Sequence, residues 1–119
     1  MGIQIKRVYA EPEKSDGARI LVDRLWPRGL SKEKAHVDLW LKEAAPSTDL
    51  RKWFAHAPEK WPEFQSRYID KLKSHSAELA LLKEKSARGV VTLLFGARDE
   101  EHNEAVVLKH VLDRKLDRK

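Results

Sequence analysis

The chain has 119 residues, which is close to the commonest size for one domain and long enough to bury a hydrophobic core. It has no cysteine, which excludes disulfides, thiolate zinc sites and cysteine nucleophiles. Lys and Arg outnumber Asp and Glu by 24 to 19, a formal net charge of +5 with the two signs interspersed. This balance permits nucleic acid or phosphate ligands without requiring them. There is no signal-peptide pattern and no apolar run long enough to span a membrane, so we expect a cytoplasmic protein.

The N-terminal half alternates strands with short helices. Ser31, and either Ser47 or Thr48, stand where a side-chain oxygen can accept the free N–H groups at the start of a helix. Ser47 lacks the Gly-x-Ser-x-Gly pattern of an activated serine, so we interpret it as a cap rather than a nucleophile. Pro27 and Gly29 end the second strand. In chain order, the expected elements are strands over 3–9 and 18–25, a helical turn over 32–35, a short strand over 37–42 and a helix over 49–55.

The C-terminal half predicts three longer helices and one buried strand. The first helix begins near 59–62, the second runs from a cap at Ser76 to Gly89, and the last covers about 100–115. Between them, Val90–Phe95 is continuously apolar, which is typical of a central parallel strand covered on both faces. Side chains at helical spacing form the expected inner faces of the helices. They are Trp61, Phe64, Tyr68 and Leu72 on the first, Leu79, Ala80 and Leu82 on the second, and Ala105, Leu108, Val111 and Leu112 on the last.

Strands followed by helices indicate one small α/β domain over residues 1–119. We expect three layers, in which a short, mostly parallel sheet is flanked by helices. The last residues, 113–119, are expected to form a frayed tail. In an open α/β sheet, ligands bind outside the carboxyl ends of the strands, so a site is expected at that edge.

Polar and aromatic side chains follow the second strand. Arg24, Trp26 and Arg28 come directly after its apolar end. Guanidinium groups bind phosphate or carboxylate through paired hydrogen bonds, and an indole ring can stack on a base or a cation. These three residues are therefore candidate ligand-binding residues. The alternative is that the indole packs in the core and the arginines pair with aspartates such as Asp23.

A second polar cluster follows the strand at 90–95. Arg98 and Asn103 are candidate ligand-binding residues, and we expect Arg98 to share one pocket with the two arginines of the first cluster. Asp99 and His102 are a candidate catalytic pair, because a carboxylate beside an imidazole can orient it as a general base. The alternative is that the aspartate caps a helix and the histidine lies on the surface. The sequence has no metal-site spacing and no phosphate-loop or dinucleotide fingerprint, so no metal and no cofactor are predicted.

Several segments occur together in the order found in one known family. They are Asp23-Arg-Leu-Trp-Pro-Arg-Gly29, Trp40-Leu-Lys, Ala45-Pro-Ser47, Leu50-Arg-Lys-Trp-Phe-Ala-His56 and the segment from Gly89 to Asn103. From about Ile3 to Leu112, the chain resembles the domain-of-unknown-function 488 family, the YeaO-like small proteins. The resemblance implies a compact bacterial or archaeal cytoplasmic α/β protein. It carries no catalytic residue over to this chain.

Three functional hypotheses are compatible with the sequence. The favoured hypothesis is that the protein binds or processes a phosphorylated or nucleotide-like small molecule at the carboxyl edge of its sheet, with or without catalysis. The second is a nucleic-acid-binding accessory protein, although interspersed acidic residues predict that such binding is weak and nonspecific at most. The third is a partner-binding protein, for example a homodimer that uses Trp40 or Trp53. We expect a monomer or a homodimer and no membrane partner.

Overall fold

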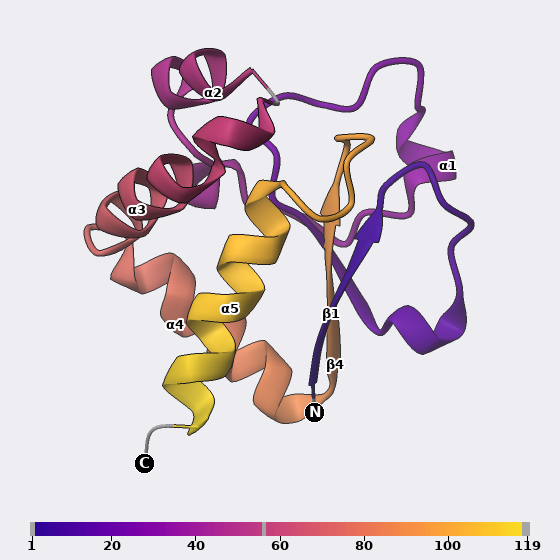
Figure 1. Ribbon diagram of the computed structural model, residues 1–119. Helices are drawn as coiled ribbons and strands as arrows, with labels where there is room; N and C mark the ends of the chain where they lie inside the picture. Colours follow the sequence, from indigo (N-terminus) through magenta and orange to yellow (C-terminus); the bar gives the residue numbers. More distant parts are fainter. Residues whose placement is uncertain (1, 56, 118–119) are drawn as a thin grey trace.

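A computed structural model describes residues 2–55 and 57–117, with side-chain burial described through residue 114. Four parallel strands form one sheet in the order β1-β4-β2-β3. The strands are β1 (Gly2–Arg7), β2 (Ala18–Leu21), β3 (Leu39–Trp40) and β4 (Val90–Phe95). The helices are α1 (Lys32–Ala35), α2 (Thr48–Phe54), α3 (Trp61–Leu72), α4 (Ser76–Arg88) and α5 (Glu104–Asp117). The expected α/β class with a parallel sheet is confirmed (Figure 1).

β4 lies in the middle of the sheet, as its continuous apolar sequence predicts. Leu93 pairs with Ile5 of β1 on one side and with Ile20 of β2 on the other. Residues 91–95 are all buried. A strand covered on both faces has no solvent side for polar residues, which explains the absence of alternation.

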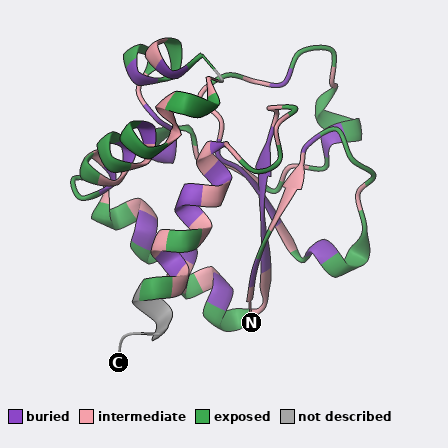
Figure 2. Ribbon diagram, in the orientation of Figure 1, coloured by how far each residue is buried: buried purple, intermediate pink, exposed green. Residues whose placement is uncertain are grey.

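Each face of the sheet has its own hydrophobic cluster, so the domain has three layers. α3, α4 and α5 cover one face, and the sides that they turn toward the sheet are buried (Figure 2). α1 and long loops cover the other face with a smaller cluster. The buried members of that cluster are Val8, Leu21, Ala35 and Leu94, with Trp26, Leu30, Val37 and Trp40 packed against them.

Two serines cap helices as predicted. Ser31 Oγ accepts the N–H of Lys34 at 3.2 Å, and Ser47 Oγ accepts the N–H of Leu50 at 3.1 Å. Each bond satisfies one of the N–H groups that lack a partner inside the helix. The cap at Ser47 sets where α2 begins, and α2 forms one wall of the cavity described below.

Two expectations for α4 are wrong. Ser76 is the first helical residue rather than the cap, and the N-cap position is His75, whose side chain makes no capping bond. Ala80 is exposed rather than inward. The buried stripe runs through Leu79 and Leu82, and a residue next to the first of these is rotated by about 100° around the helix axis.

The last helix begins later and runs further than expected. α5 starts at Glu104, because the side chain of Asn103 accepts the N–H of Val106 at 3.1 Å and so caps the helix there. The expected frayed tail is helical through Asp117, and residues 118–119 lie outside the described chain. The later start leaves residues 96–103 as a loop between β4 and α5.

A buried ion pair fastens the second face of the sheet. Arg19 of β2 donates to Asp16 at 2.5 Å, and both side chains are almost fully buried. The same guanidinium donates to the carbonyls of Ala35 and His36, at the end of α1, at 2.8 and 2.9 Å. Lys6 of β1 also donates to Asp16 at 3.1 Å. Arg19 of the sheet is therefore bonded both to the loop that contains Asp16 and to the end of α1.

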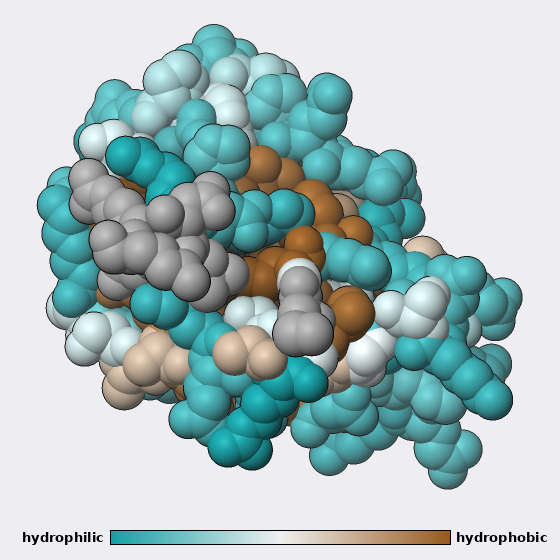
Figure 3. All heavy atoms as spheres, turned by 90° about the horizontal axis from the view of Figure 1, so that it is seen from below, coloured by the Kyte–Doolittle hydropathy of each residue, from teal (hydrophilic) through white to brown (hydrophobic). Residues whose placement is uncertain are grey.

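The two edges of the sheet lie at opposite ends of the domain (Figure 1). Figure 3 looks onto the amino edge, where an apolar area is surrounded by hydrophilic residues. The carboxyl ends of the strands lie at the opposite edge, at the top of Figure 1. No helix in the described part of the chain is long and apolar enough to cross a membrane.

Candidate functional site

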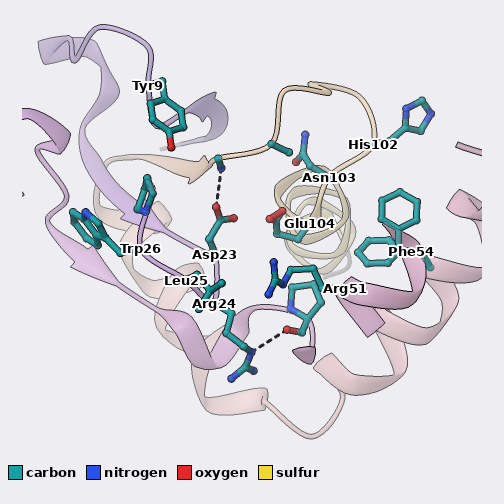
Figure 4. A pocket seen from close by; sticks show the side chains of 15 residues that line it. Tyr9, Asp23, Arg24, Leu25, Trp26, Arg51, Phe54, His102, Asn103 and Glu104 are labelled. Carbon is teal, nitrogen blue, oxygen red and sulfur yellow. Dashed lines mark hydrogen bonds between the residues drawn. The ribbon is translucent and has the colours of Figure 1, made fainter. Parts of the chain in front are cut away.

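A cavity of about 250 Å³ lies at the carboxyl edge of the sheet, beyond the ends of β2 and β4. Asp23 follows β2 by two residues, and Glu104 is the first residue of α5. Their carboxyl groups point toward each other in the middle of the cavity (Figure 4). The cavity is thus at the edge where the parallel topology predicts a site.

The two carboxyl groups form a pair that holds a proton. Asp23 Oδ2 accepts the backbone N–H of Gly96 at 2.8 Å. Asp23 Oδ1 is buried and receives no hydrogen bond from any N–H or hydroxyl group of the described residues. Burial, then hydrogen bonding to Asp23 and repulsion by its charge, raise the pKa of Glu104 well above the usual value. Glu104 therefore keeps its proton over a pH range in which an ordinary glutamate is ionised, and its carboxyl group hydrogen-bonds to Asp23.

Two arginines lie on one side of the carboxyl pair. Arg24 donates from Nε to the carbonyl of Pro46 at 3.1 Å, and Arg51 extends from α2. The positive charge of Arg51 lowers the pKa of Glu104, but it does not outweigh burial and Asp23. Among the described residues, Arg24 donates no further side-chain hydrogen bond, and Arg51 donates none. Most of their donors therefore remain available to a ligand.

The buried segment 44–46 holds this side of the cavity in place. Its three carbonyl groups accept hydrogen bonds from the Tyr68 hydroxyl at 2.5 Å, from Lys71 Nζ and from Arg24 Nε. Burial, followed by the neighbouring carboxyl groups of Glu104 and Asp23, raises the pKa of Tyr68, so its hydroxyl stays a donor. Because the segment leads directly into the cap of α2, it also determines where α2 places its side chains.

Two further residues support the strand ends from outside the cavity. Arg7, at the end of β1, donates to the carbonyl of Gly96 at 3.3 Å and to the next carbonyl at 2.9 Å, and its guanidinium lies 5.1 Å from the ring centre of Tyr9. The indole N–H of Trp40 donates to the backbone carbonyl of Asp23 at 2.7 Å. The backbone on both sides of the Asp23 carboxylate is thereby held by side chains of neighbouring strands.

The structure separates the predicted residues of the first cluster. Arg24 and Trp26 line the cavity, whereas Arg28 is exposed and does not. The indole of Trp26 donates to a backbone carbonyl at 2.7 Å and packs edge-on against Trp40 at 5.4 Å. This tryptophan thus packs in the smaller cluster and borders the cavity at the same time.

The second cluster is also divided. His102 and Asn103 line the cavity, but Arg98 and Asp99 line a separate hollow beside it. Arg98 is exposed. The expected convergence of Arg24, Arg28 and Arg98 is therefore not what the structure has, because the loops after β2 and β4 turn the latter two outward.

Asp99 and His102 contact each other within the loop rather than on a helix. His102 Nδ1 lies 2.9 Å from Asp99 Oδ2. The N–H of Glu101, and then the side chain and N–H of His102, donate to this carboxylate and lower the pKa of Asp99. The imidazole packs edge-on against Trp61 at 5.1 Å and lies away from the carboxyl pair in Figure 4. Asp99 thus orients His102, and of these two residues only His102 lines the cavity.

Asn103 is committed to local structure. It is buried, its side-chain nitrogen donates to the carbonyl of Asp99 at 2.9 Å, and its side-chain oxygen caps α5. By setting the start of α5, it sets the position of Glu104. Within the described residues, no three His, Asp or Glu side chains are grouped as a metal site.

Sequence reasoning did not single out Glu104 or the cavity role of Arg51. Glu104 follows Glu100 and Glu101 closely, and nothing in the sequence distinguishes the partly buried glutamate from its exposed neighbours. The sequence places Asp23 among the polar residues at a strand end and offers it as a partner for the arginines, without assigning it to the site. The useful signal was positional, because Asp23 directly follows a buried strand.

The fold and the cavity define a small α/β domain with one parallel sheet and a candidate site at its carboxyl edge. The chain belongs to the family described as the inactive DUF488-N3 subclade, which matches residues 2–119. It is 44% identical over 108 residues to the uncharacterized protein YeaO of Escherichia coli K12, covering 91% of this chain and 94% of that one. It is 41% identical over 111 residues to the uncharacterized protein Rv3073c of Mycobacterium tuberculosis H37Rv, covering 93% of each. No solved structure matches the chain.

Proposed function

We propose that this protein binds a small phosphorylated, nucleotide-like molecule in the cavity at the carboxyl edge of its sheet. The observation that carries the proposal is the combination of a proton-sharing carboxyl pair, Asp23 and Glu104, with two guanidinium groups, Arg24 and Arg51, around one cavity. The first pair offers acceptors to hydroxyl or N–H groups of a ligand. The second pair offers donors to an anion.

The charges of the cavity favour an anion. With Glu104 protonated, the single negative charge of Asp23 faces the two positive charges of Arg24 and Arg51. Burial, and then the charge of Arg24, also lower the pKa of nearby Lys71. A phosphate group would relieve the repulsion among these cations and would accept the guanidinium donors that the protein leaves unused.

The mouth of the cavity favours a ligand with a ring or a sugar. Tyr9 and Leu25 line the cavity, and both are large hydrophobic side chains that are exposed, to 42% and 60%. Trp26 borders the same side. Since pockets for complete drug-sized ligands measure about 300–1,000 Å³, a cavity of about 250 Å³ suits part of a ligand, with the rest across these exposed side chains.

Binding without transformation is favoured over catalysis. The chain belongs to a subclade that is described as inactive, and it has no cysteine nucleophile. The oriented imidazole of His102 lies away from the carboxyl pair, so the two groups do not work on one reacting atom in this geometry. Incubation of the protein with each bound phosphorylated compound, followed by chromatography, should recover the compound unchanged.

The test is a thermal-shift and calorimetric screen of inorganic phosphate, sugar phosphates and mononucleotides. A ligand at 100 times its Kd adds about 2.7 kcal/mol to the free energy of unfolding, which raises the Tm by several degrees. Arg51→Ala should abolish the shift, whereas Arg28→Ala and Arg98→Ala, which remove exposed arginines outside the cavity, should keep it. Absence of any shift, or equal loss in all three variants, would overturn the proposal. Tight, sequence-selective nucleic-acid binding at physiological salt would do the same.

A further inference from the structure

We infer that the Asp23–Glu104 pair recognises adjacent hydroxyl groups, so that the ligand is a phosphorylated compound with a free vicinal diol, such as a ribose phosphate or a ribonucleotide. This inference rests on the proposed function and assigns a different part of the ligand from the phosphate. The juxtaposition that carries it is a buried, unsatisfied carboxylate oxygen beside a second carboxyl group that lines the same cavity.

The pair is an acceptor site. Leaving a buried carboxylate oxygen without a hydrogen bond costs several kcal/mol, and Asp23 Oδ1 has no N–H or hydroxyl partner among the described residues. A protonated carboxyl group still has acceptor capacity on its other oxygen, and Glu104 lines the cavity. The group that a ligand brings to this place must therefore be a hydrogen-bond donor.

The donor must also be uncharged. The groups that face Glu104 are Asp23 beyond β2, Arg51 on α2 and Tyr68 on α3, and the Tyr68 hydroxyl is occupied by the carbonyl of Ala44. An ammonium group would be repelled by Arg51 and by the other cavity arginine. Hydroxyl groups carry no charge, and two carboxyl groups side by side match two hydroxyls on neighbouring carbons. Acidic side chains at strand ends bind ribose hydroxyls in the same way in dinucleotide-binding folds.

The arrangement also orders the ligand in space. Asp23 and Glu104 lie in the middle of the cavity (Figure 4), whereas Arg51 is an exposed residue of its lining. A phosphate cannot lie on the Asp23 carboxylate because the charges repel. The diol therefore occupies the middle of the cavity, and the phosphate lies on the arginines.

The experiment is a calorimetric comparison of ribose 5-phosphate, 2-deoxyribose 5-phosphate and inorganic phosphate on the full chain. We expect ribose 5-phosphate to bind at least about tenfold more tightly than the 2-deoxy compound, because hydrogen bonds to charged groups are worth about that factor or more. Glu104→Leu should reduce the ratio of the two affinities to about one while binding of the phosphate persists. Glu104→Gln, which keeps an acceptor oxygen and an N–H for Asp23, should preserve the ratio.

The outcomes separate this inference from the proposed function. Equal affinities of the wild-type protein for the two sugar phosphates would overturn the diol assignment and leave phosphate binding intact. No binding of any phosphorylated compound would overturn both. The wild-type comparison decides the matter even if Glu104→Leu does not fold.

Discussion

The backbone N–H of Gly96 donates to Asp23 Oδ2 at 2.8 Å, and a Cβ atom at Gly96 would lie 2.9 Å from that same oxygen. The two residues follow the neighbouring strands β4 and β2. A glycine is thus required where the carboxylate approaches the backbone, and this contact joins the two strand ends beneath the cavity.

Gly96→Ala should displace the Asp23 carboxylate and break its hydrogen bond. We expect the variant to lose about 1–3 kcal/mol of unfolding free energy, the usual range for overpacking, and to lose most of its affinity for the ligand found in the screen. Gly89→Ala is the matched control, because Gly89 has an extended backbone and no atom lies within 4 Å of the place that an added methyl group would take. Urea denaturation and calorimetry measure the two effects. Wild-type behaviour of Gly96→Ala would show that the close approach is unimportant.

Glu104→Gln should remove a pH dependence of stability. Because the pKa of Glu104 is raised in the folded protein, its contribution is fully present below its usual value of 4.5 and is lost as the pH rises through the raised value. Across that window the wild type should lose up to about 1.4 kcal/mol per pH unit relative to the variant. Denaturation midpoints at a series of pH values measure this difference. Glu63→Gln, on an exposed helix pair with Arg67, should follow the wild type, and a parallel pH profile for both variants would contradict the assignment.

Arg19→Met should be strongly destabilising. It removes one of the two cations that bond to the buried Asp16, and breaking a buried ion pair from one side costs about 3–5 kcal/mol. Arg88→Met, which breaks an exposed pair with Glu84 at 3.5 Å, should change stability by less than about 1 kcal/mol. Chemical denaturation of the two variants provides the comparison. Similar losses in both would mean that burial of the first pair has no energetic consequence.

The same ion pair predicts a loss of stability in acid. Burial alone raises the pKa of Asp16, but hydrogen bonds from the N–H of Glu13 and from Lys6 and Arg19 outweigh it and lower the pKa. Asp16 therefore stabilises the fold above its usual value of 3.8, and this contribution is lost as the pH falls through the lowered value. Asp16→Asn should weaken the acid dependence, which denaturation between about pH 2 and pH 5 would measure. An unchanged acid limb in this variant would refute the assignment.

Gly17→Ala should cost more than Gly29→Ala. Both glycines have positive φ, 64° and 76°, so alanine is strained at either position by about 1–2 kcal/mol. At Gly17 the added Cβ would also lie 2.2 Å from the carbonyl oxygen of Val90, whereas nothing lies within 4 Å at Gly29. Thermal unfolding should rank Gly29→Ala clearly above Gly17→Ala. An equal Tm for the two variants would show that the turn moves freely away from β4.

The sequence alone determined the features that depend on near neighbours. The serine caps of α1 and α2, the buried character of β4 and the inner stripe of α3 are all visible as local patterns. They are predictable because a capping bond spans three residues and a helix or strand repeats its side-chain directions every few residues. The parallel sheet followed from strands alternating with helices, and this topology indicated the correct edge for the cavity.

Only the tertiary structure decided which polar side chains share the cavity. Asp23 and Glu104 are distant in the sequence and meet because β4 inserts beside β2 and Asn103 starts α5 at one particular residue. Arg51 replaces Arg28 and Arg98 as a cavity arginine, because a loop's backbone path sets the direction of each side chain and the sequence shows no period there. The raised pKa of Glu104 also depends on the tertiary structure, because its causes, burial and the neighbouring Asp23 carboxylate, arise only in the packed fold.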